Sequence, residues 1–134
     1  MNTSKTFTEN EIATIVVDAA LKIHKQLGSG LMESAYQKVM MIELAKRGLS
    51  VESEVPIPVI FEGNQIDSGF RADIVVENKV ILELKAIQRN NYVHKQQLLS
   101  YLKLSNLKLG LVINFGSQLI KDGINRVVNG LEED

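Results

Sequence analysis

The chain has 134 residues, of which 45% are hydrophobic and 23% are charged, and its formal net charge is −1. This is the composition of an ordinary soluble globular protein, and the length suits a single domain over 1–134 with a loose N-terminus at 1–7. The absence of cysteine excludes disulfides and thiolate metal sites, and two histidines make a zinc site unexpected. No apolar run is long enough to span a membrane and no leader opens the chain, so we expect a cytoplasmic protein.

Charge is distributed unevenly along the chain. Twelve of the sixteen acidic residues lie in 1–83, and no Asp or Glu occurs between Leu84 and Lys121. A local charge of +6 attracts phosphates, but lysines on a solvated helix face give the same pattern, and both interpretations stay open. The six basic residues of this segment are Lys85, Arg89, Lys95, Lys103, Lys108 and Lys121.

Two amphipathic helices are expected at the start of the chain. Thr8 and Glu11 have the spacing of a capping box, and apolar residues then recur every three or four positions until Gly28. His24 is expected to be exposed on this first helix. A second helical pattern runs over about 31–47, and we expect both helices to pack on the same sheet.

A first strand is expected from the alternating apolar residues of 51–61. Pro56 and Pro58 favour an edge strand or an irregular one, because proline cannot donate a ladder hydrogen bond. A turn at 62–64 and a short segment at 66–70 then lead into the next strand.

The remaining elements predict a mixed sheet. Segments 71–76 and 80–87 have the pattern of an antiparallel hairpin. They are followed by a helix over 92–105 and a nearly unbroken apolar strand over 107–115, which predicts parallel pairing between the second hairpin strand and this one. The segment 124–128 is expected to be a last short strand or helix.

Three charged side chains interrupt the apolar hairpin. Glu83 and Lys85 share one face of their strand because they are two residues apart. A three-residue turn at 77–79 opposes Asp73 to Glu83 with β-carbons roughly 5 Å apart, whereas a two-residue turn sends Asp73 to the other face. We expect the first register because it also places apolar residues opposite one another behind the acids.

Two opposed carboxylates repel one another unless a cation lies between them. Mg²⁺ suits such a site, since it takes carboxylate oxygens at about 2.1 Å. Lys85 could then orient or deprotonate a water bound to the metal. The alternative is a partly buried salt bridge between Lys85 and one acid.

Two motifs carry a resemblance to known proteins. Asp73, nine residues, then Glu83-Leu84-Lys85 resembles the D…(D/E)xK signature of the PD-(D/E)XK nuclease superfamily, which is related to restriction endonucleases. Residues 30–36, GLMESAY, resemble the signature of the GxxExxY family within it. The likeness continues through RADIVVENKVILELKA, HKQQLLSYLKL and LGLVINFG, covering about 10–128, although Ala72 stands where the superfamily often has proline.

The resemblance implies an α/β fold with a restriction-endonuclease-like αβββαβ core, a mixed central sheet flanked by helices and an extra N-terminal helix. It also implies Mg²⁺ or Mn²⁺ held by Asp73, Glu83, the main-chain carbonyl of Leu84, and Glu33, with Lys85 serving the attacking water. Glu33 has an alternative role at the start of a helix, where an acid favours the helix dipole.

The resemblance also indicates residues for binding substrate. Gln97 and Tyr101 resemble the QxxxY motif of RecB-like exonuclease modules, in which these residues hold the lysine or a phosphate. Tyr36 is expected on the same helix face as Glu33. His94 could contact phosphate or cap its helix. The predicted substrate-binding residues are Gln97, Tyr101, Tyr36, Arg89, His94 and Lys95.

The functional hypothesis is a Mg²⁺-dependent nuclease or related phosphodiesterase that cuts DNA, more than RNA, by a metal-activated water. A homodimer is one way for so short a chain to complete a DNA clamp. The first alternative is a catalytically weak or inactive nuclease-fold module that binds nucleic acid or a protein partner. The second is a purely structural fold in which Lys85 is salt-bridged.

Overall fold

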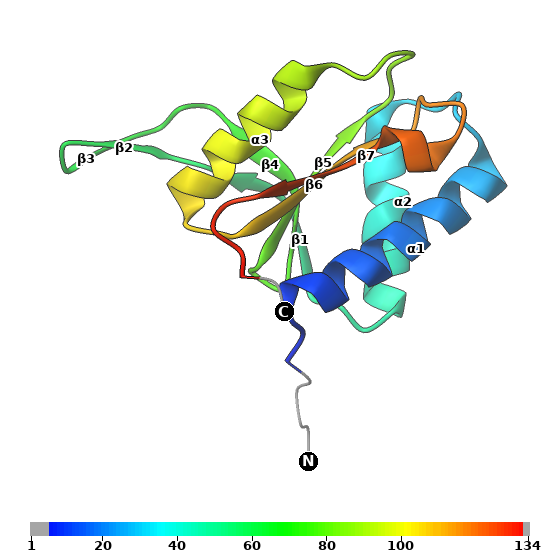
Figure 1. The fold of residues 1–134 in the computed structure, drawn as a ribbon, viewed down its shortest axis with the longest axis horizontal. Helices are drawn as coiled ribbons and strands as arrows, with labels where there is room; N and C mark the ends of the chain where they lie inside the picture. The colour runs from blue at the N-terminus through cyan, green and yellow to red at the C-terminus, as the bar shows by residue number, and fades with distance from the viewer. Residues whose placement is uncertain (1–5, 133–134) are drawn as a thin grey trace.

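A mixed five-stranded sheet forms the centre of the computed structural model, which describes residues 6–132 (Figure 1). The β5 and β6 strands are parallel and the other neighbours are antiparallel, so the predicted mixed α/β fold is confirmed. Most of the N-terminal segment that was expected to be loose lies outside the described residues. In spatial order the strands are β1 (Val51–Pro56), β4 (Arg71–Val76), β5 (Val80–Lys85), β6 (Leu109–Asn114) and β7 (Ile124–Val128).

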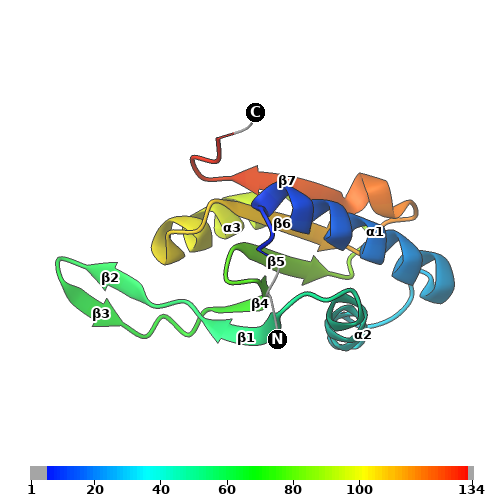
Figure 2. The ribbon, with the colours of Figure 1, turned by 90° about the horizontal axis from the view of Figure 1, so that it is seen from below.

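Helices cover both faces of this sheet (Figures 1 and 2). The helices α1 (Glu9–Leu27) and α2 (Glu33–Lys46) lie on one face, and α3 (Tyr92–Ser105) lies on the other, while the short 3₁₀ helix η1 (Ile120–Gly123) precedes β7. The predicted capping box at the start of α1 is present. Within residues 6–132, no helix is long and apolar enough to cross a membrane.

The apolar residues of β4 and β5 divide between the two faces. Ile74 and Leu82 pack in the core beneath α1 and α2. Val75 and Ile81 pack in the second core, beneath α3. Because side chains alternate along a strand, Glu83, two positions from Ile81, also points toward α3. In β4 the alternation is interrupted, since Ala72 packs in the same core as Val75.

The segment between β1 and β4 forms a separate two-stranded arm. Its strands are β2 (Val59–Phe61) and β3 (Asn64–Ile66), which pair with each other and project from the body (Figures 1 and 2). The apolar alternation predicted one strand over 51–61, but β1 ends at Pro56 and β2 begins only after Pro58. β1 is an edge strand, as the prolines indicated.

His24 differs from the expectation of an exposed side chain. It is half-buried, and its Nε2 lies 2.9 Å from the carbonyl oxygen of Ser117. The loop after β6 folds back on α1, a contact between residues 93 positions apart that helical periodicity does not reveal.

Candidate active site

The β4–β5 hairpin has the predicted three-residue turn. Val76 pairs with Val80, and Ile74 pairs with Leu82. The turn residues Glu77 and Asn78 both have left-handed φ values of 54°. The predicted register is therefore confirmed as far as Ile74 and Leu82, and Asp73 and Glu83 are the next residues outward from this last pair.

Those acids, Asp73 and Glu83, are held by the backbone of each other's strand. The Asp73 N–H donates to Glu83 Oε2 at 2.8 Å, and the Leu84 N–H donates to Asp73 Oδ2 at 2.7 Å. Within residues 6–132, Asp73 Oδ1 and Glu83 Oε1 accept no hydrogen bond, and Lys85 forms no ion pair with either acid. We call Asp73 and Glu83 the carboxylate pair.

The surroundings of the carboxylate pair disfavour negative charge. Burial, and then the charge of Asp73, raise the pKa of Glu83 to about 8. Burial also raises the pKa of Asp73, although the Leu84 N–H and Lys85 oppose this. A pair with raised pKa values and no neutralising partner will hold a proton or accept a cation.

Two further acids lie close enough to act on the carboxylate pair. The charges of Glu33, the first residue of α2, and of Glu54 in β1 both raise the pKa of Asp73. Glu54 has a left-handed φ of 52°, and Gln37 Nε2 donates to its Oε2 at 3.1 Å. Our sequence analysis missed Glu54. The β1–β4 register, in which Ser53 pairs with Ile74, would have indicated it.

The predicted metal-ligand set is assembled only in part. In the described region, no three acidic or histidine side chains converge closely enough to hold a metal ion. That Glu33 joins Asp73 and Glu83 as a ligand stays a prediction, and the structure shows its charge acting on Asp73. Leu84, expected to lend its carbonyl, contributes its N–H to Asp73. The two unbonded carboxylate oxygens are nevertheless the hard donors that Mg²⁺ or Mn²⁺ prefers.

The α3 helix lies over the carboxylate pair. Burial, followed by the charges of Glu83 and Asp73, raises the pKa of Tyr101. His94 lies toward the start of the helix, where burial and then the Lys85 charge lower its pKa. Its buried Nδ1 has no hydrogen-bond partner among the described residues, so a polar partner is missing on this side of the site.

The other predicted α3 residues lie nearer the surface. Gln97 is exposed and its side chain makes no hydrogen bond within 6–132, so the expected contact with Lys85 is not formed. Lys95 is half-buried with its Nζ 5.9 Å from the ring centroid of Tyr92. Arg89 is exposed in the loop that precedes α3.

Tyr36 belongs to the core and not to the substrate surface. It is fully buried, and its ring stacks on Phe115 with centroids 4.4 Å apart. Its hydroxyl donates to the Gly28 carbonyl at 2.6 Å and accepts from the Leu31 N–H at 3.1 Å. The predicted substrate contact is therefore corrected, because the hydroxyl closes the α1–α2 loop.

Asn114, at the end of β6, fixes the loop between Lys85 and α3. Its Oδ1 accepts from the N–H groups of Ile87 and Gly116, both at 3.0 Å, and its Nδ2 donates to Asn90 Oδ1 at 3.0 Å. The backbone of Ile87 lies where any side chain at Gly116 would have to go. Sequence reasoning missed Asn114, although a polar residue ending an apolar strand was a usable signal.

A groove of about 770 Å³ lies away from the carboxylate pair, between α1 and the β6–β7 edge. Ala13, Val17, Ile124 and Arg126 contribute to its lining, and Asp18 is the one acid there. The groove lacks paired carboxylates, so we place the chemistry at the carboxylate pair despite the size of the groove.

Comparison with known families agrees with this geometry. The PD-(D/E)XK nuclease superfamily matches residues 10–127, a span that includes the carboxylate pair, Lys85 and α3. Searches of curated proteins and of solved structures give no match. The match covers most of the chain, and on this basis the chain belongs to the PD-(D/E)XK nuclease superfamily.

Proposed function

We propose that this chain is a Mg²⁺- or Mn²⁺-dependent nuclease that hydrolyses phosphodiester bonds of DNA. The main support is the carboxylate pair, which two backbone N–H groups hold in place while one oxygen of each acid accepts no hydrogen bond from the described residues. A divalent ion bound there would supply Lewis-acid activation of a water molecule and of the scissile phosphate. The GxxExxY-like segment at 30–36 supports the same assignment on the sequence side.

Different residues of the chain would then bind the ion and orient the water. Asp73 and Glu83 would hold the ion, and Lys85, two positions along β5 from Glu83, would orient the attacking water and take part in its proton transfer. Glu33 and Glu54 would increase the negative potential that attracts the cation. This division predicts separate losses of metal binding and of turnover.

The acid-free segment 84–121 would line the substrate path. Arg89 and Lys95 place positive charge beside α3, and Gln97 and His94 offer polar groups to a phosphate. DNA is our expected substrate, and a homodimer would extend the contact surface. The cytoplasmic location and the single domain over 1–134 stay predictions.

A cleavage assay tests the proposal. Purified protein should cut single-stranded or duplex DNA with Mg²⁺ or Mn²⁺ but not with EDTA. Lys85→Ala and Asp73→Asn should each abolish cutting, while Lys46→Ala, an exposed lysine in the last turn of α2, should not. Equal cleavage by wild type and by the Lys85 and Asp73 variants would overturn it.

A second function is a nuclease-fold module that binds nucleic acid or a protein without useful turnover. The observation in its favour is that no third acid or histidine completes a metal site within 6–132. Calorimetry discriminates between the two: intact DNA binding with no uptake of Mg²⁺ or Mn²⁺ would favour the binding module.

A further inference from the structure

Aromatic side chains are few in this chain, and their placement is uneven. Seven Phe and Tyr residues occur in the sequence, with no Trp. Three of them are exposed: Phe61 at 61%, Phe70 at 45% and Tyr92 at 69%. Phe70 directly precedes β4, Tyr92 begins α3, and Phe61 lies on the arm.

Phe70 lies next to the carboxylate pair. It precedes β4, three residues before Asp73, and its ring packs on Tyr101 with centroids 5.5 Å apart and planes inclined by 48°. Tyr101 is itself close enough to Glu83 and Asp73 for their charges to raise its pKa. One part of the Phe70 ring is therefore covered, and the rest is open to solvent beside the reacting groups.

Tyr92 lies at the other end of α3 and on the opposite helix face from Tyr101, because nine residues make about two and a half turns. It is the first residue of α3, nine positions before Tyr101, which is about 13 Å along the helix axis at 1.5 Å per residue. His94, with its unpartnered Nδ1, lies between these positions. Phe70 thus lies beside the carboxylate pair, and Tyr92 is an exposed ring at the start of the helix that covers this pair.

Positive charge accompanies both rings. Arg71 follows Phe70 directly and is exposed, as is Arg89 in the loop before Tyr92. Lys95 Nζ lies 5.9 Å from the Tyr92 ring centroid. Exposed aromatic rings interleaved with cations are the combination that binds single strands, because bases stack on the rings while the cations follow the phosphates.

We propose that the substrate of this site is single-stranded nucleic acid, with unpaired bases stacking on Phe70 and Tyr92. This inference rests on the proposed nuclease function and specifies its substrate class. In a duplex the faces of the bases are already stacked on one another, so these rings gain nothing from paired bases. The cations beside the rings favour a polyanion over an apolar protein surface.

The arm provides a matched control for this proposal. Phe61 is as exposed as the two site aromatics, but it lies next to the arm turn, four residues beyond Ile57 and so about 13 Å along an extended chain. Two acids, Glu62 and Asp67, and no Lys or Arg occur in 57–70. The negative charge of the arm therefore disfavours phosphates, and we do not count the Phe61 ring as part of the stacking surface.

Fluorescence anisotropy with labelled oligonucleotides tests the inference without turnover. Single-stranded DNA, single-stranded RNA and a duplex of the same sequence are titrated with protein, with Ca²⁺ replacing Mg²⁺. We expect wild type to prefer a single strand, and Phe70→Leu and Tyr92→Leu each to weaken that binding by about 5- to 150-fold. Duplex binding by both variants, and single-strand binding by Phe61→Leu, should stay unchanged.

Three results would overturn the inference: equal affinity of wild type for single strand and duplex, an equal loss in Phe61→Leu, or a dimer that Phe70→Leu dissociates without loss of single-strand binding. The last would show that the rings form a protein interface. Circular dichroism checks that each variant is folded. Single-strand binding through both rings without Mg²⁺- or Mn²⁺-dependent cleavage would overturn only the nuclease proposal.

Discussion

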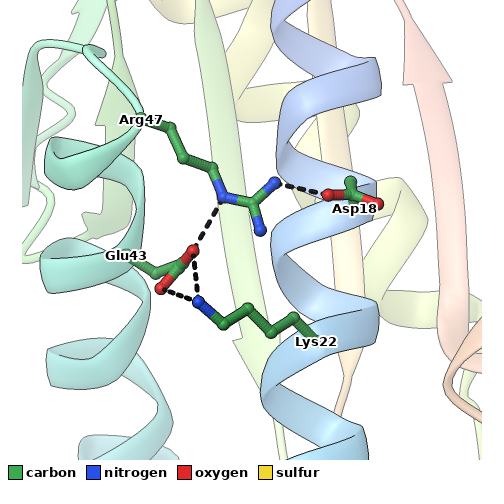
Figure 3. A network of polar contacts seen from close by, with 4 residues as sticks. All are labelled: Asp18, Lys22, Glu43 and Arg47. Atoms are coloured by element: carbon green, nitrogen blue, oxygen red, sulfur yellow. Dashed lines mark hydrogen bonds and ion pairs between the residues drawn. The ribbon is translucent and has the colours of Figure 1, made fainter.

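Two groups of carboxylates in this protein have opposite surroundings. Glu43, which is 11% exposed between α1 and α2, accepts from Lys22 Nζ at 3.1 and 3.2 Å and from Arg47 Nε at 2.8 Å (Figure 3). Arg47 also binds Asp18 at 2.6 Å. Hydrogen bonds from Arg47, and then from Lys22, lower the pKa of Glu43, whereas burial raises the pKa of Glu83.

Under the proposed function, this difference separates a structural acid from a functional one. Glu43 has its cations within the fold, so its charge joins two helices and nothing further is needed. Asp73 and Glu83 have backbone donors but, among residues 6–132, no ion pair with a basic side chain, so their charges oppose folding and a bound cation would relieve this. An acid that destabilises its own fold is better explained by a bound cation than by stability.

Replacing Glu83 should have the largest effect. Glu83→Gln keeps an oxygen that can accept from the Asp73 N–H but removes the charge, so we expect Mn²⁺ affinity and cleavage to fall by about 100-fold or more. Calorimetry and single-turnover cleavage measure the two losses. Glu43→Gln is the matched control and should bind Mn²⁺ as wild type does. Wild-type Mn²⁺ affinity in Glu83→Gln would remove the distinction between the two groups.

Asn114 should have the next largest effect, because it fixes the loop that carries α3 over the carboxylate pair. Asn114→Ala leaves the Ile87 and Gly116 N–H groups without their acceptor, and we expect a loss of about 2–3 kcal/mol in the free energy of unfolding. Denaturant unfolding and hydrogen exchange at the Ile87 amide measure it. Asn90→Ala removes the bond to Asn114 Nδ2 and an exposed bond to the Asp122 carbonyl but leaves both N–H groups their acceptor, so it should cost less. Unchanged protection at Ile87 would contradict this role for Asn114.

The parts of the structure that sequence predicted depend on local geometry. The capping box at Thr8 and Glu11 uses residues three positions apart. The register that joins Asp73 and Glu83 follows from the length of one turn and the alternation of side chains. The position of the carboxylate pair could therefore be predicted from the sequence.

The parts that sequence did not reveal depend on contacts between distant segments. Glu54 faces the site only because β1 pairs with β4, and Asn114 acts on a loop 27 residues earlier. Tyr36 follows the helical period of Glu33, yet its hydroxyl is used by the α1–α2 loop. Helical spacing gives the face of a residue but not which neighbour covers that face.

The two groups should also give opposite dependence of stability on pH in EDTA. Glu83 has a pKa near 8 when folded against an ordinary 4.5, so its protonated form favours folding. Stability should fall as pH rises from about 4.5 to 8, by at most about 1.4 kcal/mol per pH unit for one proton, and Glu83→Gln should flatten this fall.

Glu43 acts in the other sense, because its lowered pKa contributes stability above 4.5 that is lost as pH falls further. Thermal unfolding across this pH range measures both pH dependences, that of Glu83 and that of Glu43. Mg²⁺ should raise the Tm of wild type more above pH 8 than below pH 6, because the ion competes with protons for the carboxylate pair. An equal Mg²⁺ effect at both pH values would contradict metal binding at the carboxylate pair.

The smallest effect should come from removing Lys22 from the ion-paired group around Glu43. Lys22 is 45% exposed and Glu43 keeps Arg47, so Lys22→Met should cost no more than about 1 kcal/mol, and less at high salt. Denaturant unfolding at two NaCl concentrations measures this cost.

Lys85→Met is the matching change beside the carboxylate pair. It should leave stability nearly unchanged, since Lys85 forms no ion pair with Asp73 or Glu83, but it should stop cleavage. A larger stability loss for Lys85→Met than for Lys22→Met would mean that Lys85 is a structural partner of the carboxylate pair, and the contrast between the two groups would fail.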